Sequence, residues 1–170
     1  RDASDILSRA AGGRRWSVSR DTKSIVTKRT DTFRFVEEGK YQMIHGVARA
    51  VRGGEVTSGD SFTFSEGLPR QMIMSLSDGM GSGPDANRES SLAVRLLEQF
   101  LQAGVETEHA LVTLNSALAL RGEEAGGFTT VDLLQVDLFT GDGVVFKLGA
   151  APTYVRKGGT VRRISGASLP

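Results

Sequence analysis

The fold is decided by residues 76–84, Leu-Ser-Asp-Gly-Met-Gly-Ser-Gly-Pro. This stretch follows a short apolar run typical of a strand and precedes the longest helix-like segment of the sequence, residues 85–104. Its three glycines allow positive φ angles and a close approach of the backbone to a ligand. A carboxylate beside a free carbonyl suits Mg²⁺ or Mn²⁺, and a helix N-terminus favours an anion such as phosphate. The stretch by itself fits equally a plain strand-to-helix turn, in which Asp78 only caps the loop.

The composition limits the classes of site that the chain can build. Its 170 residues carry a formal net charge of +1 and only 6% aromatic residues. No long-range field therefore favours nucleic acid or an acidic membrane as a partner, and base-stacking surfaces are scarce. The absence of cysteine and the presence of only two histidines, His45 and His109, exclude thiolate and histidine-rich zinc sites. Any metal ion must be held by oxygen.

The ends of the sequence indicate a piece of a longer protein. The chain opens on Arg1, shows no signal-peptide pattern in these residues, and contains no apolar run near the ~18 residues of a membrane span. We interpret residues 1–30 as an N-terminal linker or edge segment and residues 31–170 as the domain proper. Within the first part, the pattern predicts a helix over residues 3–11 and weak strands near Trp16 and Ile25.

The apolar pattern of the rest predicts an α+β fold. Alternation over residues 33–51 predicts a β-hairpin with one buried face, on which His45 is a half-buried structural residue. Strands follow at 62–64 and 71–78, and then two helices. The first helix has a capping box at Ser82 and Asp85. The second helix begins at Thr107 and ends at a loop over residues 121–127. Apolar stripes on both helices are interpreted as core: Ala93, Leu96, Leu97, Phe100 and Leu101 on the first, and Leu111, Leu114 and Leu118 on the second. Further strands are predicted at 128–139, 144–148, 153–156 and 161–164.

Two aspartates form the candidate site. Asp60 and Asp78 each stand beside glycine at a strand end, across a hairpin, so antiparallel pairing can bring them together. With the Gly79 carbonyl and water they make part of an octahedral oxygen shell. Two such ions about 4 Å apart deprotonate a bridging water and hold a phosphoryl group for in-line attack. Aspartate beside glycine is also common in ordinary turns.

Several motifs resemble one known family. They are Gly46-Val47-Ala48-Arg49, Ser58-Gly59-Asp60-Ser61-Phe62, the Leu76–Gly83 block, Thr130-Val131-Asp132-Leu133 and Leu148-Gly149-Ala150. In order and spacing, over roughly residues 30–170, they resemble the phosphatase domain of the stage II sporulation protein E family. That family belongs to the metal-dependent (type C) serine/threonine protein phosphatases.

The resemblance implies both a fold and a reaction. It implies an antiparallel β-sandwich with flanking antiparallel helix pairs, here C-terminally truncated, and a site for two ions of Mn²⁺ or Mg²⁺. Asp78 would bridge the ions, the Gly79 carbonyl would bind one, and Asp60 would bind directly or through water. The substrate would be a phosphoserine on an anti-sigma-factor antagonist protein during sporulation. The domain would be the cytoplasmic part of a membrane-anchored bacterial protein, without contacts to nucleic acid or membrane; a homodimer is left open.

The sequence departs from the family at its C-terminal end. The family has further metal-binding aspartates, and none of Asp132, Asp137 and Asp142 matches them, so they are expected beyond Pro170. Low or no activity is therefore expected of these 170 residues alone. The alternative hypothesis is a catalytically idle phosphatase-like module for binding or scaffolding. Nucleotide binding is disfavoured, because the glycine loop matches neither a Walker nor a dinucleotide pattern.

Overall fold

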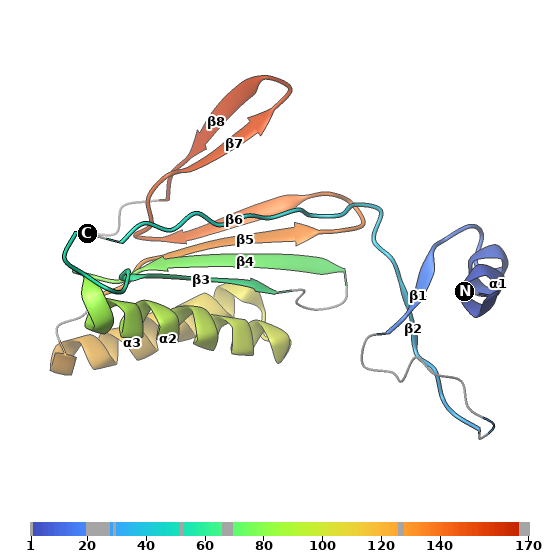
Figure 1. Cartoon of the computed structure of the whole chain (residues 1–170), viewed down its shortest axis with the longest axis horizontal. Coiled ribbons are helices and arrows are strands. Elements are labelled where there is room, and N and C mark those ends of the chain that lie inside the picture. Colours follow the sequence, from blue (N-terminus) through green and yellow to red (C-terminus); the bar gives the residue numbers. More distant parts are fainter. Residues whose placement is uncertain are drawn as a thin grey trace.

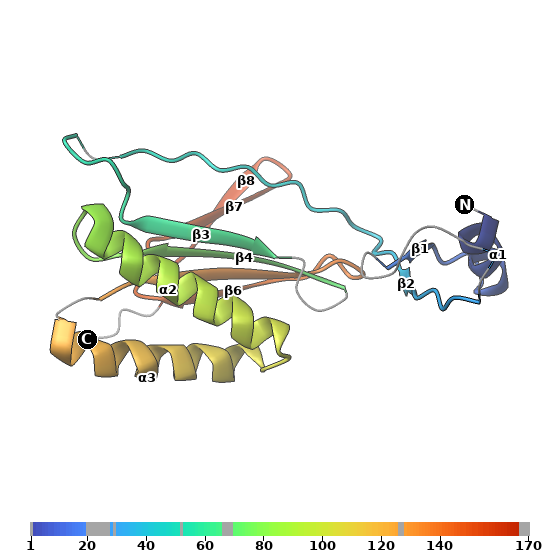
Figure 2. The same ribbon diagram turned by 60° about the horizontal axis from the view of Figure 1, so that its bottom comes forward.

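A four-stranded antiparallel sheet with two helices on one face forms the centre of the molecule (Figure 1). The computed structural model describes residues 2–19, 28, 30–51, 53–65, 70–125 and 128–166. The strands lie in the order β3 (Asp60–Ser65), β4 (Gln71–Asp78), β5 (Val131–Asp137) and β6 (Gly143–Leu148). The helices are α2 (Gly83–Gln102) and α3 (Thr107–Ala125). Figure 2 shows both helices below the sheet, with the extended segment 41–51 running along its other face.

Two smaller units stand apart from this sheet. Helix α1 (Asp2–Ala10) packs on the pair β1 (Trp16–Val18) and β2 (Phe35–Glu37), beyond one end of the sheet (Figure 1). The hairpin β7 (Thr153–Lys157) and β8 (Thr160–Ile164) projects from the β6 side. The α+β class expected from the sequence is confirmed. Among the described residues, no helix is long and apolar enough to cross a membrane.

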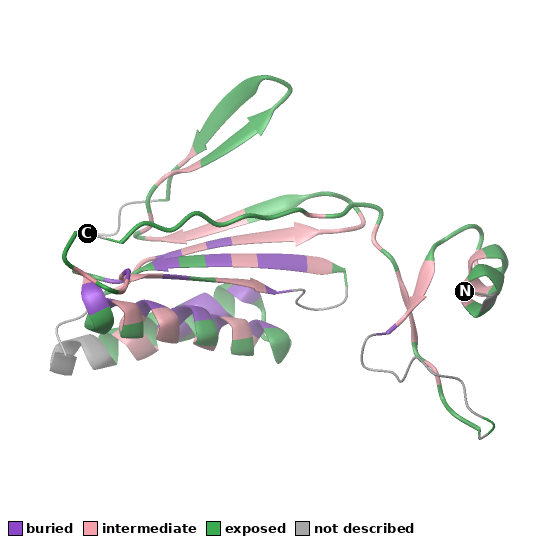
Figure 3. Cartoon of the chain, viewed as in Figure 1, coloured by how far each residue is buried: buried purple, intermediate pink, exposed green. Residues whose placement is uncertain are grey.

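The core lies between the helices and the sheet (Figure 3). Its buried residues are Ile73, Ala93, Leu97, Leu101, Ala110, Leu111, Leu114, Val131 and Leu133. Leu96, Phe100 and Leu118 pack against them and are partly buried, so both predicted helix stripes face the sheet. Apolar residues three and four apart on a helix share one face, which explains why the stripes could be predicted.

The predicted hairpin over residues 33–51 is wrong. Phe35–Glu37 pairs with Trp16–Val18, and residues 41–51 are extended but belong to no strand. The alternation is present, but a strand needs a paired strand to take up its backbone hydrogen bonds. No described strand pairs with residues 41–51, whose Tyr41 amide donates to the Leu138 carbonyl at 2.9 Å. His45 is exposed, not half-buried, and its ring stacks on Phe64 with 4.0 Å between the ring centroids.

Two details of the helices also differ from expectation. Ser82 is the N-cap of α2 but makes no capping hydrogen bond; its hydroxyl donates to Glu55 at 3.1 Å, so no capping box with Asp85 forms. Helix α3 continues to Ala125, through most of the predicted loop. The strand predicted near Ile25 lies outside the described residues.

The register separates the two faces of the sheet. Asp60 pairs with Asp78, Phe62 with Leu76, and Phe64 with Met74 across β3 and β4. Leu76 pairs in turn with Asp132, and Asp132 with Lys147. Directly paired residues of antiparallel strands point to the same face. We call this the open face, because α2 and α3 cover the opposite one.

Candidate metal centre

The two predicted site aspartates lie directly opposite each other at one end of the β3–β4 pair. Asp78 is the last residue of β4 and is exposed, and Asp60 is the first residue of β3 and half-buried. The short hairpin fixes this pairing, since one residue of slippage would send one side chain to the other face. The structure thus brings Asp60 and Asp78 together on the open face.

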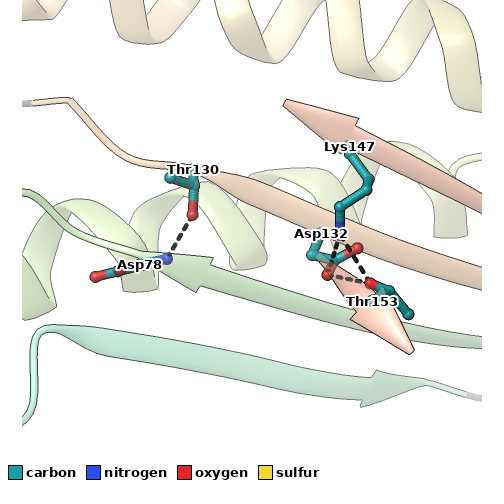
Figure 4. Close-up of polar contacts among 5 residues, drawn as sticks. All are labelled: Asp78, Thr130, Asp132, Lys147 and Thr153. Atoms are coloured by element: carbon teal, nitrogen blue, oxygen red, sulfur yellow. Dashed lines mark hydrogen bonds and ion pairs between the residues drawn. The ribbon is translucent and has the colours of Figure 1, made fainter. Parts of the chain in front are cut away.

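The backbone of Asp78 is held from the other side by Thr129 and Thr130, which lead into β5. The Asp78 amide donates to the Thr130 hydroxyl at 3.0 Å (Figure 4), and the Asp78 carbonyl accepts from the Thr130 amide and the Thr129 hydroxyl, both at 2.9 Å. The Thr129 hydroxyl also lies 2.6 Å from that of Ser77. These three hydrogen bonds between the Asp78 backbone and Thr129–Thr130 restrict the motion of the end of β4.

Gly79 is required here by space. A Cβ on Gly79 would lie 2.1 Å from the Ala86 carbonyl oxygen, so the loop crosses in direct contact with the first turns of α2. The Gly79 amide donates to the Gly59 carbonyl at 3.3 Å. The Gly79 carbonyl oxygen lies 3.5 Å from where a Cβ on Gly59 would stand, next to the start of the strand that carries Asp60. The loop therefore places this carbonyl beside Gly59, the residue that precedes Asp60.

Helix α2 holds the strand that carries Asp60 through polar side chains. The Ser90 hydroxyl, which is fully buried, donates to the Gly59 carbonyl at 2.6 Å and lies 2.9 Å from the Ser61 hydroxyl. The Asn87 amide donates to the Ser58 carbonyl at 2.9 Å. We call Asn87, Ser90 and Ser61 the α2 clasp. The clasp was missed in the sequence, although Ala86, Ser90, Ala93 and Leu97 follow helical spacing and mark one buried face.

Loss of the clasp hydroxyl should destabilise the fold. Ser90→Ala leaves the Gly59 carbonyl without its 2.6 Å donor inside the helix–sheet interface, which costs about 1–2 kcal/mol of unfolding free energy. Urea unfolding measures the loss. The matched control is Ser116→Ala: the Ser116 hydroxyl is exposed and donates to the Val112 carbonyl within α3, so its removal should change the unfolding free energy by no more than about 0.5 kcal/mol. Equal stability of the two variants would contradict the role given to the clasp.

The arrangement raises the pKa of Asp78 above its ordinary value. Partial desolvation by the neighbouring strands is the largest cause, followed by the hydrogen bond with Asp60 and repulsion from its charge. An Asp with a raised pKa in the folded state lowers stability as pH rises through that pKa, because the unfolded state ionises more readily. At neutral pH the pair is therefore destabilising. Paired carboxylates of this kind fit a divalent cation, which removes the repulsion.

Neutralising one aspartate should therefore stabilise the metal-free protein at neutral pH. Asp60→Asn removes the charge facing Asp78 and should raise the unfolding free energy by about 0.5 kcal/mol, the size of a like-charge cross-strand pair. The gain should fade at pH values below the ordinary pKa of Asp, where the Asp78 carboxyl, with its raised pKa, is protonated and the charge repulsion is gone. Urea unfolding in EDTA at both pH values measures it. Asp85→Asn is the control and should instead lower the unfolding free energy slightly. Asp85 lies in the first turn of α2, where a negative charge is favourable, and it pairs with Arg88. A less stable Asp60→Asn protein at neutral pH would contradict the account.

A buried ion pair lies on the same open face, beside Leu76, which is two residues before Asp78 on β4. The Lys147 ammonium, with a side chain 2% exposed, donates to Asp132 at 2.6 Å and to the Thr153 hydroxyl at 2.8 Å (Figure 4). The Thr153 hydroxyl itself donates to Asp132 at 2.8 Å. Asp132 and Asp60 both line a cavity of about 360 Å³ between the sheet and residues 46–50. From the sequence, Asp132 is interpreted only as one residue of an alternating strand. In the structure its carboxylate is neutralised by Lys147, so we do not count Asp132 among the candidate metal ligands.

The described residues supply part of a metal shell. Asp60 and Asp78 offer carboxylate oxygens and Gly79 a carbonyl, all hard donors that fit Mg²⁺ or Mn²⁺. No group of three or more His, Cys, Asp or Glu side chains able to hold a metal ion occurs within the described part of the chain. Asp137 ends β5 and Asp142 lies in the turn that follows it, at the far end of the sheet from the Asp60–Asp78 pair. The candidate site thus consists of two carboxylates, Asp60 and Asp78, at the point where β4 ends and the glycine loop begins.

Comparison with known proteins gives consistent matches. The family model "Stage II sporulation protein E (SpoIIE)" matches residues 69–170, more than half of the chain. Stage II sporulation protein E of Priestia megaterium is 38% identical over 130 residues, covering 76% of this chain and 22% of that protein. The chain thus spans less than a quarter of the length of this curated relative.

Solved structures agree with these matches. The PP2C phosphatase domain with a regulatory-domain fragment of SpoIIE from Bacillus subtilis is similar with a TM-score of 0.72 and 28% identity, covering 99% of this chain and 50% of that one. RsbX in complex with magnesium is similar with a TM-score of 0.55 and 24% identity, covering 69% of this chain and 57% of that one. The second likeness concerns the fold alone.

Proposed function

The chain belongs to the stage II sporulation protein E family, and from this membership we propose that it forms part of a metal-dependent serine/threonine protein phosphatase. Its fold is that of the PP2C-type phosphatases. The observation that carries the proposal is the direct opposition of Asp60 and Asp78 beside the Gly79 loop.

The chain's own residues have distinct parts in this reaction. Asp78, held rigidly by Thr129 and Thr130, would bridge two ions of Mn²⁺ or Mg²⁺, and the Gly79 carbonyl would bind one of them. Asp60 would bind directly or through water, in a position fixed by the α2 clasp. When bound, such ions supply a deprotonated water and neutralise the phosphoryl oxygens. Remaining ligands would come from outside these 170 residues, so the chain alone would have low or no activity.

The proposed substrate is a phosphoserine on an anti-sigma-factor antagonist protein. The sporulation family supports a sporulation role, and the substrate itself rests on the resemblance to the family. By the same resemblance the domain would act in the cytoplasm, as part of a membrane-anchored protein.

The test is phosphate release by the longer protein that contains this chain. Phosphoserine and phosphotyrosine forms of one antagonist-type protein are compared with Mn²⁺, with Mg²⁺ and in EDTA. Release from phosphoserine that requires the ion is the expected result. If the protein binds Mn²⁺ and retains the phosphoprotein tightly but releases no phosphate, the phosphatase proposal is wrong and the catalytically idle binding module is favoured.

A further inference from the structure

Ser58 bonds directly to the carboxylate of Asp60. Its hydroxyl donates to the Asp60 Oδ2 atom at 3.1 Å and accepts from the Asp60 backbone amide at 3.2 Å. A serine hydroxyl that bonds to the chain two residues later forms a local turn, which fixes the intervening backbone. Here the same hydroxyl also reaches the side chain, so one group restrains both the main chain of Asp60 and the orientation of its carboxylate.

Ser58 is itself shielded from solvent and held by α2. It is only 7% exposed, and buried hydroxyls are normally hydrogen-bonded. Its carbonyl accepts from the Asn87 side-chain amide at 2.9 Å and from the Arg49 guanidinium at 3.5 Å. The contacts therefore run in series, from α2 through the backbone of Ser58 to the carboxylate of Asp60.

This restraint matters where two carboxylates share a cation. Asp60 and Asp78 are directly paired, and like charges at such positions repel each other, which turns freely rotating carboxylates apart. A hydrogen bond to a ligand from outside the metal shell sets the orientation of that ligand, and its loss typically weakens metal affinity ~10–100-fold. The Ser58 hydroxyl has the position of such a group.

We propose that Ser58 is a positioning residue of the candidate metal centre and orients the Asp60 carboxylate toward a divalent ion shared with Asp78. The proposal rests on the proposed function, because it requires Asp60 to be a metal ligand, directly or through water. The Ser58 hydroxyl contacts the ligand and not the ion. Ser58→Ala removes this contact and keeps every carboxylate, so it separates the orientation of Asp60 from its charge.

The experiment compares Ser58→Ala with Ser75→Ala in the longer protein that contains this chain. Ser75 is a buried serine of β4, 4% exposed, and its hydroxyl lies 2.7 Å from that of Thr63 on β3. Calorimetric titration gives the Mn²⁺ affinity, and urea unfolding in EDTA gives the folded fraction that corrects it. We expect Ser58→Ala to bind Mn²⁺ about tenfold more weakly than wild type, equivalent to about 1.4 kcal/mol, and Ser75→Ala to bind as wild type does.

Two further measurements separate positioning from a general structural role. In the Asp60→Asn background, Ser58→Ala should weaken Mn²⁺ binding no further, because the carboxylate that Ser58 orients is gone. In phosphate release, Ser58→Ala should raise the Mn²⁺ concentration for half-maximal rate about tenfold and leave the KM for the phosphoprotein unchanged.

Three results would overturn the proposal. They are equal Mn²⁺ affinities of Ser58→Ala and wild type, an equal loss in Ser58→Ala and Ser75→Ala, and a Ser58→Ala loss that persists in the Asp60→Asn background. Failure of the phosphatase is distinguishable: a wild type that binds Mn²⁺ without releasing phosphate would reject the proposed function, while the Mn²⁺ affinities would still decide the role of Ser58. A wild type that does not bind Mn²⁺ would reject both.

Discussion

Asp78→Asn should abolish metal-dependent turnover in the longer protein. The substitution keeps the shape of the side chain but removes the negative charge that would be shared between two cations. Metal activation of water and neutralisation of the phosphoryl group both depend on those ions, so the loss in kcat/KM should exceed about a thousandfold, or about 4 kcal/mol of transition-state stabilisation. Phosphate release at saturating Mn²⁺ measures it.

Two comparisons make this result specific. The Asp78 backbone is held by Thr129 and Thr130, so Asp78→Asn should fold normally, with unfolding free energy equal to or above that of wild type in EDTA. Asp60→Asn should reduce turnover less, since Asp60 is the flanking and not the bridging acid. A larger loss for Asp60→Asn than for Asp78→Asn would reverse the assigned roles.

Gly79→Ala should have the largest effect on folding. The new Cβ would meet the Ala86 carbonyl oxygen at 2.1 Å and its carbonyl carbon at 2.7 Å, and neither backbone atom can move without α2. Overpacking commonly costs 1–3 kcal/mol where side chains adjust, so a collision with helix backbone should exceed about 3 kcal/mol. Chemical denaturation measures the loss in unfolding free energy.

Two other glycines serve as graded controls. Gly46→Ala adds a Cβ with no atom within 4 Å and should be close to neutral. Gly81→Ala also meets no atom within 4 Å, but φ at Gly81 is +91°, so only backbone strain of about 1–2 kcal/mol is expected. A stability of Gly79→Ala equal to that of Gly81→Ala would mean that the loop does not press on the helix.

The fold elements around the site followed from local pattern. The β4 strand, the glycine loop and α2 were predicted, because apolar periodicity and glycine punctuation act within a few residues. The pairing of Asp60 with Asp78 could be anticipated because a short hairpin leaves few alternative registers. The residue roles at the metal centre remain predictions.

What the sequence did not reveal depends on contacts distant in the chain. Residues 41–51 alternate like a strand, but they are not one, because no strand in the described part of the chain pairs with them. Ser90 donates to a carbonyl thirty-one residues away, and hydroxyls on helices are usually interpreted as solvent-facing. The Lys147–Asp132 pair joins adjacent strands whose register could not be read from sequence.

The central claim is that Asp78 holds a divalent ion beside Asp60. Calorimetric titration of Mn²⁺ into the 170-residue chain tests it most directly, with Asp78→Asn and Asp85→Asn titrated alongside. The account predicts weak binding by wild type and by Asp85→Asn, in the range of roughly 10⁻⁴–10⁻³ M for an oxygen site with few protein ligands, and no binding by Asp78→Asn. The same Mn²⁺ affinity in wild type and Asp78→Asn would contradict it.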